Sequence, residues 1–437
     1  MIPQRVLAFY GDDFTGSTDL MEVLTWAGLP TVLFVGPPDE NKLARFPDAR
    51  AIGIAGDSRS RSPEWMSEHL PGSFEILKRL GAPLNQYKVC STFDSSPTTG
   101  SIGRALEIGQ DVFETPWSAI VVGAPALSRY QAFGNLFARV GDETFRLDRH
   151  PTMSRHPVTP MAEGDLRGHL ERQTDRKTGL VDLLALKNGG ANRALDGQIE
   201  AGARAVFVDV IDEETLVEAG RLVWERRPGE QSFTVSSSGL QYALAAYWRA
   251  AGEIGEEPPR PTAREVDQVV VVSGSCSPET EASIRWATAN GFHGVRLDAE
   301  ETAAGRIEQP LREALEALAS GRSVVLYSAL GPEDPSLVAG DGDLPRKLGE
   351  QTGRVLDAIL ERSEVRRCLV CGGDTSSHAV QQLGFYALTA IAPAAPGSPI
   401  CRAWADGPVD GLEIVLKGGQ RGGSQFFEEV RRGRVTS

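Results

Sequence analysis

Two adjacent acids, Asp12 and Asp13, follow the first apolar run of the chain, Val6 to Tyr10. This run predicts a strand, and in an open α/β sheet ligands bind where a strand ends and a helix begins. Neighbouring carboxylates repel each other unless a substrate hydroxyl, a metal or a proton relieves them. A helix cap formed by Thr18 or Asp19 is a structural alternative, but it leaves the adjacent pair unexplained. We therefore favour a ligand-facing role for Asp12 and Asp13.

Three turns rich in Gly and Ser follow apolar runs in the C-terminal part of the chain, at residues 273–278, 372–377 and 417–423. Glycines let the backbone approach a phosphate closely, hydroxyls donate hydrogen bonds, and a following helix presents its positive N-terminus. A single turn of this kind is a weak signal, and none matches a Walker A or dinucleotide motif. Together with residues 396–399, the three turns favour a cradle for one nucleoside triphosphate.

Alternating apolar runs and helical patterns predict an α/β fold on both sides of a proline-rich segment, with mainly parallel sheets flanked by helices. Because 437 residues exceed what one hydrophobic core usually supports, two domains are expected. The clustered prolines and charges predict a linker at 256–264, between domains at 1–255 and 265–437. Residues 139–161 show little periodicity and are predicted to form a long functional loop.

Composition excludes several classes of protein. The formal charge of -14 and the lack of a long basic run argue against a nucleic-acid partner. No stretch reaches the roughly 18 apolar residues of a membrane span, and no basic and apolar leader precedes the first strand, so we expect a cytoplasmic protein. Five cysteines are too few and too scattered for a disulfide framework. Cys368 and Cys371 share one apolar run and are predicted to be buried strand residues rather than metal ligands.

The order of the motifs resembles that of the four-carbon acid sugar kinase family, over essentially the whole chain. Residues 12–16 resemble the DDFTG signature of the family, and residues 88–95 resemble the KxCSTFDS segment of its 3-oxo-tetronate kinase branch. The turns at 372–376 and 417–419 resemble its ATP-binding loops. The resemblance implies that the N-terminal domain binds a sugar acid, that the C-terminal domain binds ATP, and that phosphate is transferred in the cleft between them.

The resemblance also implies roles for individual residues. The sugar-facing candidates are Asp12, Asp13, Arg59, Ser91, Thr92 and Asp94. The ATP-facing candidates are Ser275, Ser277, Gly373, Asp374, Thr375, Ser376, Gly397, Gly418 and Gly419. Asp13 is the candidate base for the acceptor hydroxyl with Asp12 as its competitor, and Arg59 is the natural clamp for a carboxylate. Asp374 is a candidate ligand of Mg²⁺ or a neighbour of the transferring phosphate.

Two segments bear on the identity of the substrate. His156 lies in the His- and Arg-rich segment 146–157 and is a further candidate for substrate contact, with a structural hydrogen bond as the alternative. Residues 95–103 depart from the pattern of 3-oxo-tetronate kinases, in which this stretch is one residue shorter and has an Asn after its Gly. The extended segment 146–157 is a second departure, so the exact sugar acid is open.

We therefore expect an ATP-dependent kinase of a small sugar acid such as 3-oxo-tetronate, threonate or erythronate. A branched five-carbon oxo acid of the 3-oxo-isoapionate type is the alternative substrate. Two rival classes are a ligase that activates a carboxylate and a sugar-acid-binding protein without turnover. The adjacent acids suit hydroxyl activation better than the binding of an anion, which favours the kinase. A homo-oligomer is left open.

Overall fold

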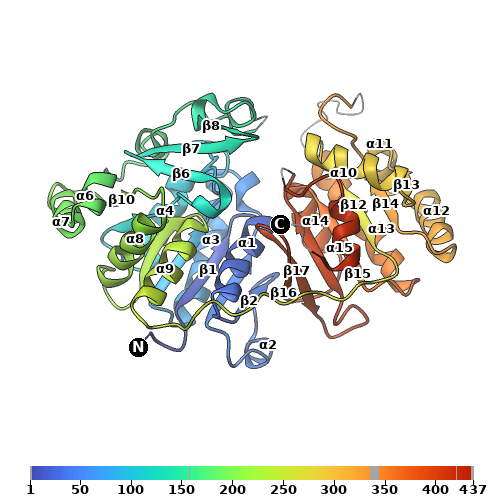
Figure 1. Ribbon diagram of the computed structural model, residues 1–437, viewed down its shortest axis with the longest axis horizontal. Helices are drawn as coiled ribbons and strands as arrows, with labels where there is room; N and C mark the ends of the chain where they lie inside the picture. The colour runs from blue at the N-terminus through green and yellow to red at the C-terminus, as the bar shows by residue number, and fades with distance from the viewer. Residues whose placement is uncertain (1, 157, 335–343, 420, 435–437) are drawn as a thin grey trace. The chain divides into compact units, whose positions relative to one another are not determined.

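The computed structural model describes residues 2–156, 158–334, 344–419 and 421–434 (Figure 1). The side chains of Asp374, Thr375 and Ser376 also lie outside the described part of the chain. The chain forms two compact units. The first consists of Met1–Asp12, Val23–Thr31 and Asp39–Pro258, and the second consists of Asp13–Glu22, Val32–Pro38 and Pro259–Ser437. Helix α1 (Phe14–Trp26) is therefore divided between the two units.

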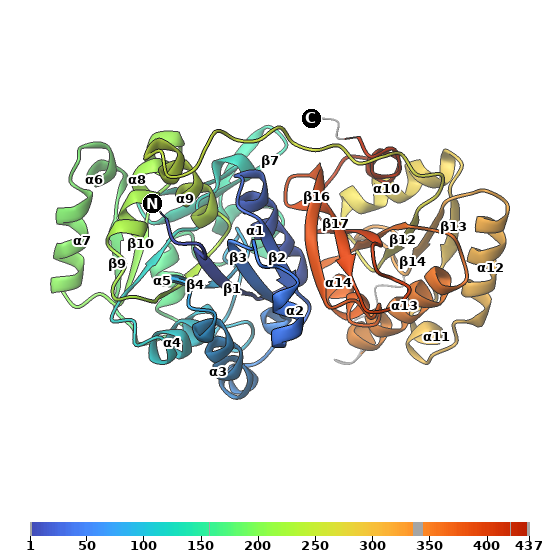
Figure 2. The same cartoon turned by 90° about the horizontal axis from the view of Figure 1, so that it is seen from below.

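The first unit contains a parallel sheet with the strand order β11-β4-β1-β3. Its strands are all buried: β1 (Leu7–Gly11), β3 (Ala51–Ala55), β4 (Leu84–Lys88) and β11 (Ser232–Ser236). Figure 2 shows helices on both sides of these strands, which is why β1 and β3 read as continuous apolar runs. The helices of this unit are α2 (Glu40–Ala44), α3 (Pro63–Arg79), α4 (Ile102–Val112), α5 (Leu166–Leu170), α6 (Leu183–Lys187), α7 (Ala191–Glu200), α8 (Glu213–Glu225) and α9 (Gly239–Ala250).

Strand β4 ends at Lys88, so a strand over Tyr87–Thr92, which the sequence predicts, is wrong beyond its first two residues. The chain turns at Phe93, whose φ of 54° is left-handed. The side chains of Val89 and Phe93 are fully buried. These apolar residues fill the core although they lie in a loop. Their apolar character is what suggested a strand in the sequence.

Two smaller sheets complete the first unit. A parallel sheet has the order β5-β10-β9, with β5 (Ser118–Ile120), β9 (Thr178–Val181) and β10 (Ala205–Val208). An antiparallel sheet, teal in Figure 1, has the order β6-β7-β8, with β6 (Arg129–Ala132), β7 (Asn135–Val140) and β8 (Glu143–Arg146). The predicted loop at 139–161 is therefore wrong for residues 139–146. Apart from the half-buried Phe145 their side chains are polar or exposed, and the turn at Gly141 has two residues, so no buried face produces a pattern.

The rest of that segment is irregular. Residues 147–155 contain two short 3₁₀ helices, η3 (Leu147–Arg149) and η4 (Met153–Arg155). Two others, η1 (Ser58–Ser60) and η2 (Pro125–Leu127), follow β3 and β5.

The second unit contains a mixed sheet with the order β2-β16-β17-β18-β15-β12-β14-β13. Its parallel strands are β12 (Val270–Ser273), β13 (His293–Arg296), β14 (Val324–Tyr327), β15 (Arg367–Cys371) and β18 (Glu413–Lys417). The antiparallel strands are β2 (Thr31–Phe34), β16 (Ala387–Ala395) and β17 (Ser398–Trp404). The mainly parallel second sheet that the sequence predicts is confirmed. The antiparallel exception includes the hairpin of β16 and β17, whose connecting turn is too short for a crossover helix.

Helices cover the second sheet, and the fold class of both units is α/β with mainly parallel sheets. These helices are α10 (Pro278–Ala289), α11 (Ala299–Ala303), α12 (Glu308–Ala319), α13 (Leu344–Glu361), α14 (Gly373–Val380) and α15 (Phe426–Arg432). Cys368 and Cys371 are fully buried in β15, as predicted. In the described part of the chain, no helix combines the length and the apolar character that crossing a bilayer requires.

Candidate active site

The carboxylate of Asp12 is bound by both arms of the Arg59 guanidinium. The Nη2–Oδ1 distance is 2.7 Å and the Nε–Oδ2 distance is 3.1 Å, and the backbone N–H of Arg59 donates to the carbonyl of Asp12 at 3.0 Å. The Asp12 side chain is 4% exposed, and a carboxylate that is buried this deeply needs a counter-charge. The charge that relieves Asp12 therefore comes from the protein itself, which the sequence did not indicate.

Asp13 forms the N-terminal cap of α1. The N–H of Gly16 donates to Oδ1 at 2.7 Å, and the hydroxyl of Thr15 donates to Oδ2 at 2.6 Å. A cap by Thr18 or Asp19 is therefore wrong, because the helix begins at Phe14 and a cap must precede its first turn. Asp13 belongs to the second unit, where a Cβ on Gly373 would lie 3.7 Å from its Oδ2. The two neighbouring acids thus have different partners.

The loop after β4 carries Ser91, Thr92 and Asp94, and all three are buried. The Thr92 hydroxyl donates to Oδ1 of Asp94 at 2.5 Å. Burial raises the pKa of Asp94, but the charge of Arg59, the Thr92 hydrogen bond and His156 together hold that pKa below its ordinary value. Arg59 therefore acts on a second carboxylate besides Asp12.

His156, at the end of η4, accepts a hydrogen bond at Nδ1 from the N–H of Thr159, at 3.1 Å. The structural hydrogen bond that we considered as the alternative is therefore present. The field of His156 also reaches Asp94, so substrate contact remains compatible with it. We call Asp12, Arg59, Asp94 and His156 the acid cluster. Two carboxylates can accept hydrogen bonds from sugar hydroxyls, while guanidinium and imidazole can donate to a carboxylate or an oxo group.

The turns after β12 and β18 pack against each other in the second unit. The hydroxyl of Ser277 caps α10, receiving the N–H of Thr280 at 3.2 Å, and it donates to the carbonyl of Gly419. A Cβ on Gly419 would lie 3.2 Å from Oγ of Ser275, so this position favours glycine. Hydroxyls and the N-terminus of α10 thus lie beside a glycine backbone that has no side chain. Phosphates bind to this kind of arrangement.

The ammonium of Lys417 lies under these turns and is fully buried. Within the described residues its hydrogen bonds go to the hydroxyl of Thr280 at 2.8 Å and to the carbonyl of Gly419 at 3.4 Å. Burial lowers the pKa of Lys417, and the field of Glu279 opposes that shift only in part. We call Ser275, Ser277, Thr280, Lys417 and Gly419 the cradle, and its buried cation suits an anionic ligand.

The third Gly-rich turn lies between β15 and α14. Gly372 has a left-handed φ of 108°, and Gly373 begins the helix. Asp374, Thr375 and Ser376 occupy its first turn, but their side chains lie outside the described part of the chain. Gly418 follows β18, and a Cβ there would lie 3.6 Å from the Arg421 side chain.

Two family models together match most of the chain: a sugar-binding N-terminal domain over residues 7–244 and a nucleotide-binding C-terminal domain over residues 270–427. The chain is 51% identical to the 3-oxo-isoapionate kinase of Paraburkholderia graminis, over 98% of this chain and 95% of that protein. It is 32% identical to the 3-oxo-tetronate kinase of Methylobacterium radiotolerans, over 96% of this chain and 97% of that protein. The chain belongs to the four-carbon acid sugar kinase family.

The fold of this kinase family is also seen in a crystal structure of the Haemophilus influenzae protein HI1011, of domain family DUF1537. That structure is similar to this chain with a TM-score of 0.69 at 28% sequence identity, and the match covers 96% of this chain and 98% of that protein.

Gly397 lies at the turn between β16 and β17. Its N–H donates to the carboxylate of Glu22 at 2.7 Å, and a Cβ there would lie 3.3 Å from Oδ1 of Asp19. A phosphate that approached this turn would meet two carboxylates, and like charges repel. We therefore leave Gly397 out of the nucleotide site that we propose for this family member.

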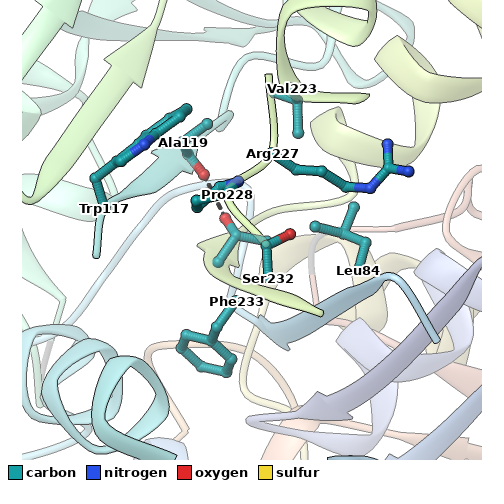
Figure 3. Close-up of a pocket in the computed structure, with 9 residues that line it drawn as sticks. Leu84, Trp117, Ala119, Val223, Arg227, Pro228, Ser232 and Phe233 are labelled. Atoms are coloured by element: carbon teal, nitrogen blue, oxygen red, sulfur yellow. Dashed lines mark hydrogen bonds between the residues drawn. The ribbon is translucent and has the colours of Figure 1, made fainter. Parts of the chain in front are cut away.

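The cavity in Figure 3 lies where β4 and β11 begin, at the end of the sheet opposite to the acid cluster. Its lining includes Leu84, Trp117, Arg227 and Phe233. Its volume of about 10 Å³ is close to what one water molecule needs, so it has no room for a sugar acid or a nucleotide.

Sequence reasoning missed the residues that hold the loop after Asp94. Ser95 contacts His169 and Gln173, which lie at and just beyond the end of α5. A His and a Gln four residues apart share one face of a helical segment, and this spacing was the available signal. Lys417 begins the turn at 417–423, but its burial cannot be seen in the sequence.

Proposed function

We propose that this chain is an ATP-dependent kinase that phosphorylates a hydroxyl of a small oxo sugar acid, and that its substrate is of the branched five-carbon 3-oxo-isoapionate type. The 51% identity to a 3-oxo-isoapionate kinase across nearly the whole chain carries the proposal. The two departures from the 3-oxo-tetronate kinase pattern, at residues 95–103 and 146–157, favour the same substrate. We place the reaction in the cytoplasm, where ATP is available.

The acid cluster would bind the sugar acid. Arg59 is held in the plane of Asp12 by two hydrogen bonds, which leaves its remaining donors at a set position for the substrate carboxylate or oxo group. Thr92, Asp94 and neighbouring Ser91 would contact sugar hydroxyls, and His156 would donate or accept according to its protonation.

Asp13 is the proposed catalytic base. It would take the proton of the acceptor hydroxyl while the oxygen attacks the γ-phosphorus and ADP departs. Asp12 remains the competitor, but its two oxygens already accept from Arg59, and this pairing makes it a weaker base. The closeness of Asp13 to Gly373, where α14 begins, also supports this choice, because phosphates bind at helix N-termini.

The cradle would bind the phosphates of ATP through Ser275, Ser277, Gly418, Gly419 and the buried ammonium of Lys417. Gly373, Asp374, Thr375 and Ser376 would add the N-terminus of α14. Mg²⁺ bound with the nucleotide would supply positive charge that neutralises the charge developing on the transferred phosphoryl group.

Among the described residues, no group of three or more His, Cys, Asp or Glu side chains could hold a metal ion by itself. Mg²⁺ with nucleotides usually relies on one or two carboxylates, on phosphates and on water, so this arrangement fits a metal that arrives with ATP. Asp374 is the proposed protein ligand.

A four-carbon substrate such as 3-oxo-tetronate, threonate or erythronate is the second candidate. The segment 88–95, which resembles the 3-oxo-tetronate kinase branch, favours it. The values of kcat/KM for the two classes of acid decide which of them is the better substrate. Size in solution would decide whether the chain forms a homo-oligomer.

The test is a coupled assay of ADP release with both classes of acid, with Mg²⁺ present and after chelation. We expect Mg²⁺-dependent turnover of the branched oxo acid with a kcat/KM above that of the four-carbon acids. A stable phosphate ester as product, rather than a labile acyl phosphate, separates the kinase from a carboxylate-activating ligase. ATP binding without turnover of any acid would contradict the proposal.

A further inference from the structure

The loop between Asp94 and helix α4 is held at both ends by two side chains from the region of α5. The hydroxyl of Ser95 lies 2.9 Å from Nε2 of His169, and Nε2 of Gln173 donates to that hydroxyl oxygen at 2.9 Å. At the other end of the loop, the N–H of Gly103 donates to Oε1 of Gln173 at 3.4 Å. One pair of side chains therefore ties the first loop residue after Asp94 to the first turn of α4.

The hydrogen bonds specify the protonation of His169. Its Nε2 lies 3.0 Å from the amide nitrogen of Gln173, which can only donate, so Nε2 is the acceptor and the imidazole is neutral. Burial lowers the pKa of His169 to about 4, assisted by Arg172, while Asp94 and Glu163 act in the opposite direction. The imidazole thus stays uncharged throughout the neutral range and accepts from Ser95 or Gln173 without adding a charge beside Asp94.

The backbone of this loop packs closely against its neighbours at two glycines. A Cβ on Gly103 would lie 2.6 Å from the carbonyl oxygen of Gln173, so α4 and the end of α5 touch through glycine. On its other side, Gly100 has a left-handed φ of 59°, and a Cβ there would lie 2.3 Å from the carbonyl oxygen of Arg59. The loop therefore packs against the backbone of Gln173 at one end and against the backbone of Arg59 at the other. Because both contacts are close, we expect a movement at one contact to displace the other.

We propose that His169 and Gln173 are positioning residues for the sugar acid, which set the place of the Asp94 carboxylate beside Arg59 by holding the adjacent Ser95. This rests on the proposed function, because it takes Asp94 as a contact of the sugar acid. The loop they hold, residues 95–103, is also where the sequence departs from the 3-oxo-tetronate kinase pattern.

The test compares His169→Phe, which keeps a ring but removes the acceptor, with His169→Gln, which keeps an acceptor. His69, exposed on α3, supplies the matched control His69→Phe. Kinetics are measured for 3-oxo-isoapionate, for 3-oxo-tetronate and for ATP. We expect His169→Phe to raise the KM for the branched acid about tenfold, the effect of one lost buried hydrogen bond, with the KM for ATP unchanged. His169→Gln should recover most of the affinity, and the control should behave like the wild type.

Two results would overturn the positioning role. One is a wild-type KM for the branched acid in His169→Phe, and the other is an equal rise in the KM for ATP. If His169→Phe does not fold, Ser95→Ala tests the same contact and should also raise the KM for the branched acid without changing the KM for ATP. A wild-type KM for the branched acid in Ser95→Ala would refute the proposal. A wild type that turns over no sugar acid refutes the proposed function instead, so the two failures can be told apart.

Discussion

The acid cluster and the cradle handle charge in opposite ways. In the acid cluster, Asp12 is paired with Arg59 inside the protein, and Asp94 lies in the same positive field. In the cradle, the described partners of the buried Lys417 are a hydroxyl and a carbonyl, which carry no charge. The first region therefore pairs charges inside the protein, whereas the second buries a cation whose hydrogen-bond partners are neutral. The first arrangement suits the hydroxyls and the acid or oxo group of a sugar acid, and the second suits a triphosphate.

This contrast has an energetic consequence. Removing one member of a buried ion pair leaves an uncompensated charge and destabilises the fold. Removing a buried cation whose hydrogen-bond partners are neutral relieves a desolvation cost instead. Variants in the acid cluster should therefore lose stability together with function, and variants in the cradle should lose nucleotide affinity alone.

The largest effect is expected for Asp13→Asn, which removes the proposed base. Loss of the base should lower kcat by about 10²- to 10⁴-fold, while Asn caps a helix about as well as Asp and so preserves stability. Steady-state kinetics and thermal unfolding measure the two quantities. Asp39→Asn, at the exposed cap of α2, is the matched control and should leave kcat unchanged. Near-normal turnover of Asp13→Asn would assign the base to Asp12.

Arg59→Ala should have the next largest effect on stability and function. It tests whether the ion pair with Asp12 stabilises the acid cluster. We expect a loss of about 2–3 kcal/mol in the free energy of unfolding, at the lower end for a broken buried pair because Arg59 is 24% exposed. The KM for the sugar acid should rise and the Kd for ATP should stay constant. Urea unfolding and calorimetric ATP titration measure these values. Arg61→Ala removes a more exposed partner of Asp57 as control, and an equal loss there would contradict the special role of Arg59.

Lys417→Met tests the cradle. The KM for ATP should rise about 10- to 100-fold, since hydrogen bonds to charged groups are the strong ones, and the KM for the sugar acid should not change. The melting temperature should stay constant or increase, because the buried ammonium is removed. Lys187→Met, at an exposed ion pair with Asp212, is the control. A fall in melting temperature without a change in ATP affinity would make Lys417 a structural residue.

The smallest effect concerns pH. Because the folded pKa of His169 is about 4, below the ordinary value of 6.5, the unfolded chain takes up a proton first as the pH falls. The contribution of His169 is complete above pH 6.5 and is lost as the pH falls toward 4. Between pH 7 and 5.5 the loss should be about 1 kcal/mol. Urea unfolding of the wild type and of His169→Gln at both pH values measures this loss. An equal change in the free energy of unfolding in the two proteins would contradict the assignment.

Local chemistry in the sequence was enough to predict the α/β class, the sheets, and the turns that contain most of the candidate residues. The strand at Ala51–Ala55 is confirmed at both ends, because a fully buried parallel strand must be apolar throughout. The polar hairpin of β7 and β8 was missed, because exposed strands have no continuous run of apolar residues. The loop after Lys88 was misread for the converse reason, as its apolar residues fill the core without forming a strand.

The sequence by itself determined which residue types stand at the strand ends: adjacent acids after the first strand, and glycines and hydroxyls after the later ones. Tertiary structure alone decided how those residues are shared. Asp12 is paired with Arg59 from 47 positions away, and Ser95 with His169 from 74 positions away. The physical reason is that strand order and register determine which distant side chains meet, and burial then sets their charge. Neither quantity is encoded in a local pattern of residues.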